Sequence, residues 1–256
     1  MQKGICSLSV VPMRRIPSDK SEMVSQLLYG ETFTIIDAVE NWVLIQNDFD
    51  MYEGWIDKRQ SKILLQPEID ALTIEQPICC TKNISEIITD SENTMLVSFG
   101  SLIHSFSMNP LPGSESDTIH NYDFQQLNSP DRQKIIEYAH LFLNVPYLWG
   151  GKSFFGIDCS GFVQLVYKVA GFTLPRDAAQ QMEHGSLISF IEQSEPADLA
   201  FFDNDEGQIV HIGIILSDNK IIHASGKIRI DSIDHYGIFN HELHRYTHRL
   251  RLIKRI

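Results

Sequence analysis

The spacing of apolar residues changes along the chain, and this change most limits the folds that the chain can adopt. In the first part they occur in short strand-like runs, such as Thr32–Val39 and Asn41–Gln46, separated by turn-rich stretches. Further on they recur at helical spacing, over 130–142 and again over Phe162–Val169. Strand-like runs then return at 198–202, 210–216, 220–224 and 249–256. Helices followed by strands predict an α+β domain.

The strand-like part divides into two smaller pieces. The regular short strands of residues 1–66, which include Tyr52–Ile56, predict a small β-barrel. Residues 67–115 hold two more candidate strands, Ile84–Ile88 and Thr94–Phe99, and we interpret them as a second small β unit. The Pro- and Gly-containing stretch Asn109–Asp117 is typical of a linker. We therefore expect three parts, over residues 1–66, 67–115 and 120–256.

Composition narrows the class of protein. Hydrophobic residues make up 43% and charged residues 21% of the 256 residues, as in an ordinary globular protein. The net charge of −12 argues against nucleic-acid and anionic-membrane partners. No run approaches the ~18 apolar residues of a membrane helix. The N-terminus lacks the pattern of a signal peptide, so we expect a cytoplasmic protein, or an envelope protein if a signal has been removed.

The four cysteines do not suggest a disulfide framework. They are Cys6, Cys79, Cys80 and Cys159. Two of them are adjacent and no C-x-x-C pair exists, so a structural zinc site is not expected. Free thiols fit a reducing compartment.

Cys159 is the candidate nucleophile. It lies between Asp158 and Ser160 and directly precedes the apolar helical run. Either neighbour can cap the helix, so the cysteine falls at or near a helix N-terminus. The backbone dipoles there favour negative charge, which predicts a lowered thiol pKa. The alternative is a small buried cysteine without a chemical role.

Two histidines have a context that suits a general base. His211 and His223 each interrupt an apolar strand-like run, and the two runs are neighbours in the sequence. Either one alone is better explained as a hydrogen-bonded structural histidine. Two such residues on neighbouring strands favour a site, because a cysteine hydrolase needs a base and a group that orients it.

The histidines of the tail are interpreted differently. His241, His244 and His248 have intervals that would suit one helical face. No set of carboxylate or cysteine ligands accompanies them, and arginines lie around them. We therefore expect no metal site and no cofactor.

Six motifs resemble those of the NlpC/P60 family of cell-wall peptidases and occur in the same order as in that family. They are Pro146–Gly151, Asp158–Val163, Leu174–Asp177, Ala197–Phe202, His211–Ile214 and His223–Gly226. The resemblance covers roughly residues 130–256. It implies a papain-like catalytic domain over 120–256, with Cys159 as nucleophile, His211 as general base and His223 as the residue that orients the base.

The barrel that precedes this domain limits the resemblance to one subgroup of the family. One or two SH3-like barrels before an NlpC/P60 domain are similar to the γ-D-glutamyl-L-diamino acid endopeptidases. The resemblance implies a murein tripeptide or tetrapeptide substrate with a free N-terminal L-Ala, from which L-Ala-γ-D-Glu is released. In that subgroup the barrel restricts specificity, and released wall peptides suggest a role in recycling.

The same resemblance implies a set of substrate-binding residues. In the catalytic domain they are Tyr147, Trp149, Asp158, Ser160 and Asp177. From the barrel, Glu22 is the candidate partner of the substrate ammonium and Tyr52 the candidate pocket wall. One departure is Ala178, where relatives often carry serine, and it removes a hydroxyl from the expected pocket.

Two alternatives stay open at this point. One is a noncatalytic peptidoglycan-binding protein, although such a protein would not need Cys159, His211 and His223 together. The other is a papain-like amidase or acyltransferase with another substrate. The sequence leaves open the oligomeric state and the diamino acid of the substrate.

Overall fold

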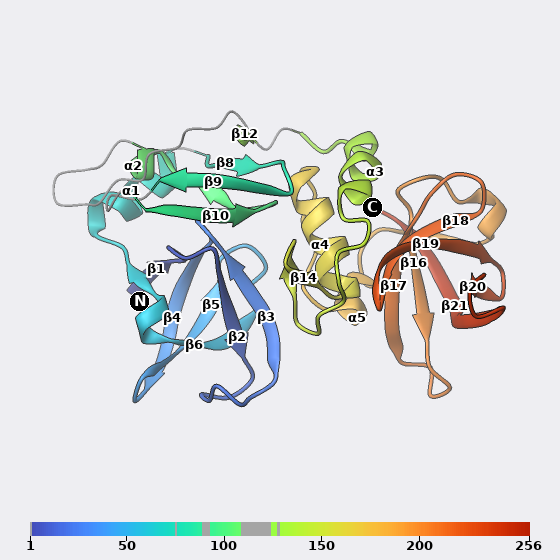
Figure 1. The fold of residues 1–256 in the computed structure, drawn as a ribbon, viewed down its shortest axis with the longest axis horizontal. Coiled ribbons are helices and arrows are strands. Elements are labelled where there is room, and N and C mark those ends of the chain that lie inside the picture. The colour runs from blue at the N-terminus through green and yellow to red at the C-terminus, as the bar shows by residue number, and fades with distance from the viewer. Residues whose placement is uncertain (1, 75, 89–92, 109–123, 127–128) are drawn as a thin grey trace. The chain divides into compact units, whose positions relative to one another are not determined.

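The computed structural model describes residues 2–74, 76–88, 93–108, 124–126 and 129–256, and its chain forms two compact units (Figure 1). The first unit comprises Met1–Asn128 and Trp149–Phe155, and the second comprises Ser129–Leu148 and Gly156–Ile256. The chain therefore passes from one unit to the other three times. The three-part division predicted above stays a prediction. Among the described residues, no helix is long and apolar enough to cross a membrane.

A seven-stranded antiparallel sheet forms most of the first unit, and Figure 1 shows its strands curling around a common interior. The strands are β1 (Gln2–Ile5), β2 (Val10–Arg14), β3 (Met23–Leu28), β4 (Thr32–Val39), β5 (Trp42–Asn47), β6 (Glu53–Asp57) and β7 (Lys62–Ile63), in the order β3-β2-β6-β5-β4-β1-β7. The predicted strands over residues 32–56 are confirmed. Alternation places Val43 and Ile45 inward, where they pack with Met13 and Phe33.

Smaller elements complete the first unit. They are the 3₁₀ helix η1 (Lys58–Gln60), α1 (Gln66–Ile74), β8 (Ile78–Cys80), β9 (Ile84–Ile88), β10 (Thr94–Ser98), β11 (Leu102–Ile103), α2 (Ser105–Met108), β12 (Phe124–Gln126) and β13 (Lys152–Ser153). The two strands predicted here are confirmed as β9 and β10. Their core includes Tyr29, which follows β3, so it is shared with the preceding sheet. The predicted linker at 109–117 lies outside the described residues.

The second unit combines helices with one antiparallel sheet, as predicted. Its elements are α3 (Arg132–Leu141), β14 (Gly156–Ile157), α4 (Cys159–Val169), α5 (Ala178–Gln181), β15 (Ser186–Ile188), the 3₁₀ helix η2 (Ile191–Gln193), β16 (Leu199–Asp203), β17 (Ile209–Ile215), β18 (Lys220–Ser225), β19 (Lys227–Asp234), β20 (Gly237–Asn240) and β21 (Arg245–Arg255). The strand order is β15-β21-β16-β17-β18-β19-β20, and β20 also pairs with β21.

Helix α4 is the central helix of the second unit. Every one of its residues is buried, and it packs against β17 and β18 (Figure 1). Helix α3 also contacts α4, and the rings of Phe142 and Phe162 meet edge to face with centroids 5.7 Å apart. This packing fixes the first turn of α4 beside the strands that carry the two predicted histidines.

Candidate active site

Cys159 occupies the first position of α4. Asp158 is the N-cap, with extended backbone and a carboxylate that accepts the Gly161 amide at 2.7 Å, which decides between the two caps considered above. The predicted lowering of the thiol pKa is wrong. Burial, together with the charge of Asp158, raises the pKa of Cys159 to about 11, and the helix amides do not compensate. The thiol is therefore protonated in the resting protein.

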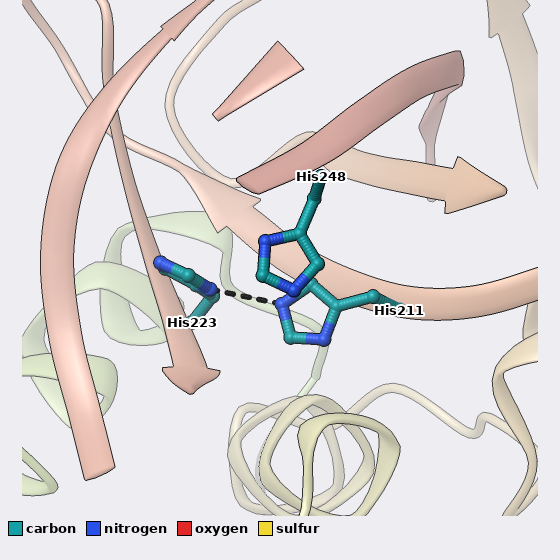
Figure 2. A group of neighbouring side chains, drawn as sticks. All are labelled: His211, His223 and His248. Atoms are coloured by element: carbon teal, nitrogen blue, oxygen red, sulfur yellow. Dashed lines mark hydrogen bonds between the residues drawn. The ribbon is translucent and has the colours of Figure 1, made fainter. Parts of the chain in front are cut away.

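His211 and His223 lie on the neighbouring strands β17 and β18 and contact each other. Nε2 of His211 is 2.8 Å from Nδ1 of His223, as the dashed line in Figure 2 shows. Burial is the main cause that lowers the pKa of both rings, so both are neutral near pH 7. The backbone amide of Ile212, next to His211, donates a hydrogen bond to the Cys159 sulfur. The second unit thus brings the three predicted catalytic residues together.

Behind His223 lies a carboxylate that the motifs did not indicate. Oδ2 of Asp231 is 3.0 Å from Nε2 of His223, and Arg229 holds the same carboxylate with Nε at 2.7 Å and Nη2 at 3.1 Å. Both residues are on β19, the strand next to β18. The available signal was a charged pair, Arg229 and Asp231, two residues apart in the strand that follows the one with His223.

His248 is the second residue that sequence reasoning missed. Its ring stacks on that of His211, with centroids 4.1 Å apart and planes inclined by 24° (Figure 2). His241, His244 and His248 do not lie on a helical face, because β20 and β21 form a hairpin there. His241 instead contacts the Ser232 hydroxyl, and His244 lies in the turn with a φ of 51°.

The three clustered rings are the residues to consider for a metal ion. Nitrogens of His211, His223 and His248 all lie within 4.8 Å of one another. Imidazole lone pairs lie in the ring plane, so the nearly parallel rings of His211 and His248 do not point to a common centre. Nε2 of His211 is also engaged with His223. An ion would require the rings to turn, so this arrangement is that of a hydrogen-bonded pair with a stacked third ring.

Tyr147 lies near the nucleophile, as predicted. It bridges to Ile157, two residues before Cys159. Burial, followed by the charges of Cys159 and Asp158, raises the pKa of Tyr147 to about 12. Its hydroxyl is therefore a neutral hydrogen-bond donor at any physiological pH.

Two of the predicted substrate residues hold a buried arginine. Arg176 donates to both carboxylate oxygens of Asp158, at 2.6 and 3.0 Å, and to the Ser160 hydroxyl at 2.9 Å. Arg176 is only 1% exposed, so this contact is part of the interior of the second unit. Asp177, the next residue, caps α5 through a capping box with Gln180. These contacts give the motif residues a structural role beside the predicted one.

Three predicted substrate residues belong to the first unit. Glu22 accepts the indole N–H of Trp149 at 2.7 Å and pairs with Nε of Arg15 at 2.7 Å. Trp149 is 59% exposed, so a carboxylate and an accessible aromatic ring stand side by side. Tyr52 is partly buried against the barrel core.

Comparison with known proteins agrees with this geometry. The NlpC/P60 family matches residues 144–247, and the SH3 domain of bacterial dipeptidyl-peptidases matches residues 13–60. A γ-D-glutamyl-L-lysine dipeptidyl-peptidase of Bacillus cereus is 26% identical over 231 residues, which cover 81% of this chain and 68% of that protein. Dipeptidyl-peptidase 6 of Lysinibacillus sphaericus is 26% identical over 254 residues, 85% of this chain and 87% of that protein.

A shorter match and a solved structure complete the comparison. A γ-D-glutamyl-L-lysine dipeptidyl-peptidase of Bacillus subtilis is 39% identical over 94 residues, 36% of this chain and 31% of that protein. The crystal structure of an NlpC/P60 family protein from Bacillus cereus has a TM-score of 0.84 at 21% identity and covers 99% of both chains, so the fold is shared. This chain therefore contains an NlpC/P60 peptidase domain, over residues 144–247, preceded by a bacterial SH3 domain, over residues 13–60.

Proposed function

We propose that the protein hydrolyses the bond between γ-D-Glu and the L-diamino acid of murein peptides with a free N-terminal L-Ala, and releases L-Ala-γ-D-Glu. The observation that carries the proposal is the contact between His211 and His223 beside a cysteine at a helix N-terminus. The names of the Bacillus relatives support the bond that is cut.

The pKa directions define the first chemical step. Cys159 is a thiol and His211 a neutral base, so proton transfer accompanies attack. Nε2 of His211 faces His223, which leaves Nδ1 to take the thiol proton. The sulfur forms a bond to the γ-carbonyl carbon as the S–H bond breaks. His211 then gives this proton to the leaving amine, and water hydrolyses the resulting thioester.

The oxyanion of the intermediate needs donors that are already in place. The backbone N–H of Cys159, in the first turn of α4, is one candidate. The neutral hydroxyl of Tyr147 is the second, because Tyr147 bridges to Ile157, two residues before Cys159. Two such donors would stabilise the tetrahedral intermediate without any change in their protonation.

The substrate ammonium is proposed to bind Glu22. An ammonium is attracted by a carboxylate and by the face of an indole, and Glu22 and Trp149 present both. Arg15 already pairs with this carboxylate, so the ammonium would share it or displace the arginine. In intact murein the L-Ala nitrogen is bonded to the glycan. A free-amine requirement therefore restricts the enzyme to released peptides, which supports a role in murein recycling.

The test compares two substrates. The enzyme is incubated with L-Ala-γ-D-Glu-diaminopimelate and with its N-acetylated form, and products are identified by mass spectrometry. We expect release of L-Ala-γ-D-Glu from the free peptide only, and no release by Cys159→Ala. Equal cleavage of both peptides would contradict the free-amine requirement. The lysine-containing peptide, tested in parallel, determines which diamino acid is preferred.

A binding-site variant separates recognition from chemistry. Glu22→Gln should raise KM for the free peptide with a much smaller change in kcat. Glu53→Gln is the matched control in the same unit, because Glu53 is exposed and its carboxylate bonds only the neutral Gln46 side chain among the contacts described. An unchanged KM in Glu22→Gln would show that Glu22 does not bind the substrate. It would not contradict the proposed peptidase activity.

A further inference from the structure

Four side chains on three adjacent strands form one hydrogen-bonded row in the second unit. His211 on β17 contacts His223 on β18, which contacts Asp231 on β19, and Arg229 of β19 holds that carboxylate. His211, His223 and Asp231 are all buried, with at most 6% of each exposed. Solvent therefore does not supply alternative partners, and the protons in the row are determined by the groups themselves.

Asp231 is the fixed end of this row. Burial raises the pKa of its carboxyl group, but hydrogen bonds from His223 and Arg229 lower that pKa by more. The carboxylate is therefore ionised at neutral pH and can only accept hydrogen bonds. Arg229 contributes two of these bonds and is itself anchored to Glu242 at 3.0 Å. The charge and the orientation of Asp231 are both set before any reaction begins.

The ionised Asp231 carboxylate determines which ring nitrogen of His223, and then of His211, carries hydrogen. Nε2 of His223 must carry hydrogen to bond with Asp231, and the ring is neutral because burial lowers its pKa. Its Nδ1 is then a lone pair, which accepts hydrogen from Nε2 of His211. Nδ1 of His211 is left without hydrogen, as a base requires. With the row reversed, His211 would carry hydrogen on Nδ1 and could not receive the thiol proton.

We propose that Asp231 is a positioning residue that sets the tautomers of His223 and His211 and so keeps Nδ1 of His211 free to accept the Cys159 proton. The inference rests on the proposed peptidase chemistry. Asp231 takes no proton itself in the reaction. Its negative charge, on the far side of His223, also stabilises electrostatically the imidazolium that forms on His211. The charged or titratable groups around His223 are His211, Asp231 and His248, with Arg229 behind the carboxylate.

The test replaces the carboxylate by an amide. In Asp231→Asn the new amide N–H can donate to Nε2 of His223, which a carboxylate cannot do. His223 can then carry its hydrogen on Nδ1 instead, and the reversed row becomes accessible. With ¹⁵N-labelled histidine, long-range ¹H–¹⁵N spectra report which ring nitrogen carries hydrogen. We expect Nε2–H for both histidines in the native protein and a population with Nδ1–H on His211 in the variant. We expect kcat for the murein tripeptide to fall about 10- to 100-fold with little change in KM.

Asp234→Asn is the matched control. Asp234 is on the same strand, and its replacement by asparagine removes the same charge. Its carboxylate accepts a hydrogen bond from Tyr246 and does not contact His211 or His223. Asp231→Glu is the second variant, since it keeps a carboxylate and should keep the native tautomers. Nε2–H on both histidines in Asp231→Asn, with kcat within about twofold of the Asp234→Asn value, overturns the inference. The tautomers are measured without substrate, so this test does not depend on the proposed function. If the native protein shows Nε2–H on both histidines but cleaves no murein peptide, the proposed function is refuted and the role of Asp231 in setting the tautomers is not.

Discussion

The ring of His248 stacks on the ring of His211 in the interior of the second unit, with 4.1 Å between centroids. Burial is the main cause that lowers the pKa of His211, and repulsion from His248 lowers it further. Burial also lowers the pKa of His248, to about 4. His248 thus holds the ring of the proposed base in place and opposes its protonation in acid, where His248 itself becomes charged.

Replacing His248 by phenylalanine should shift the acid limb of the pH–rate profile. His248→Phe keeps the stacked ring and removes the repulsion, so the pKa of His211 rises. Protonated His211 cannot act as a base, so kcat/KM should begin to fall at a higher pH than in the native enzyme. Profiles of kcat/KM from about pH 4 to 8 measure this shift. His184→Phe, at an exposed position, should leave the profile unchanged. A shift toward lower pH would contradict the assignment.

The thiol of Cys159 should react slowly at neutral pH. Its pKa is raised to about 11, and the thiolate is the species that alkylating reagents modify. In the protein without substrate, the rate of iodoacetamide labelling should continue to rise through about pH 10. Peptide mapping distinguishes Cys159 from the three other buried cysteines. A rate that is already constant near about pH 8 would show a lowered pKa and would restore the prediction made from the helix N-terminus.

Local pattern was sufficient for much of the fold. The alternation of Val43 and Ile45 predicts the face of β5 that is buried, and the polar residue before Cys159 predicts the start of α4. The two candidate catalytic histidines, His211 and His223, stand out in the sequence because each interrupts an apolar strand. In these cases the information lies within a few residues of the position predicted.

The missed features depend on contacts between distant segments. Asp231 reaches His223 only through the register of β18 with β19, and His248 reaches His211 only through the placement of β21 in the sheet. The pKa of Cys159 depends on burial, which outweighs the local helix effect. Nothing local marks Trp149–Phe155 as part of the first unit, because its partners lie more than fifty residues away.

Loss of Arg176 should destabilise the second unit strongly. Its guanidinium and the Asp158 carboxylate are buried together, so Arg176→Ala removes the cation from a buried carboxylate. We expect the free energy of unfolding to fall by about 3–5 kcal/mol, measured by urea denaturation. Arg251→Ala is the control, since Arg251 is exposed and its nearest ion-pair contact to Asp203 is 3.8 Å. That variant should lose less than about 1 kcal/mol. Similar losses in the two variants would contradict the argument from burial.

A second buried ion pair fastens the segment Trp149–Phe155 within the first unit. Nζ of Lys152 lies 3.0 and 3.1 Å from the carboxylate oxygens of Glu31, and both side chains are 1% exposed. The backbone amides of Lys152 and Phe154 donate to Gln26 and Ser98. In Lys152→Met the Glu31 carboxylate stays buried without its cation. The first unit should therefore lose about 3–5 kcal/mol of unfolding free energy.

A double variant tests the origin of this loss. Adding Glu31→Gln to Lys152→Met removes the buried charge and keeps an oxygen that can accept the Leu28 amide, so most of the stability should return. Lys3→Met is the matched control in the same unit, because Lys3 and Asp48 form a more exposed pair and its loss should cost less than about 1 kcal/mol. Hydrogen exchange over residues 149–155 should accelerate in the single variant and recover in the double variant. If the double variant were less stable than Lys152→Met alone, the buried charge would not be the cause.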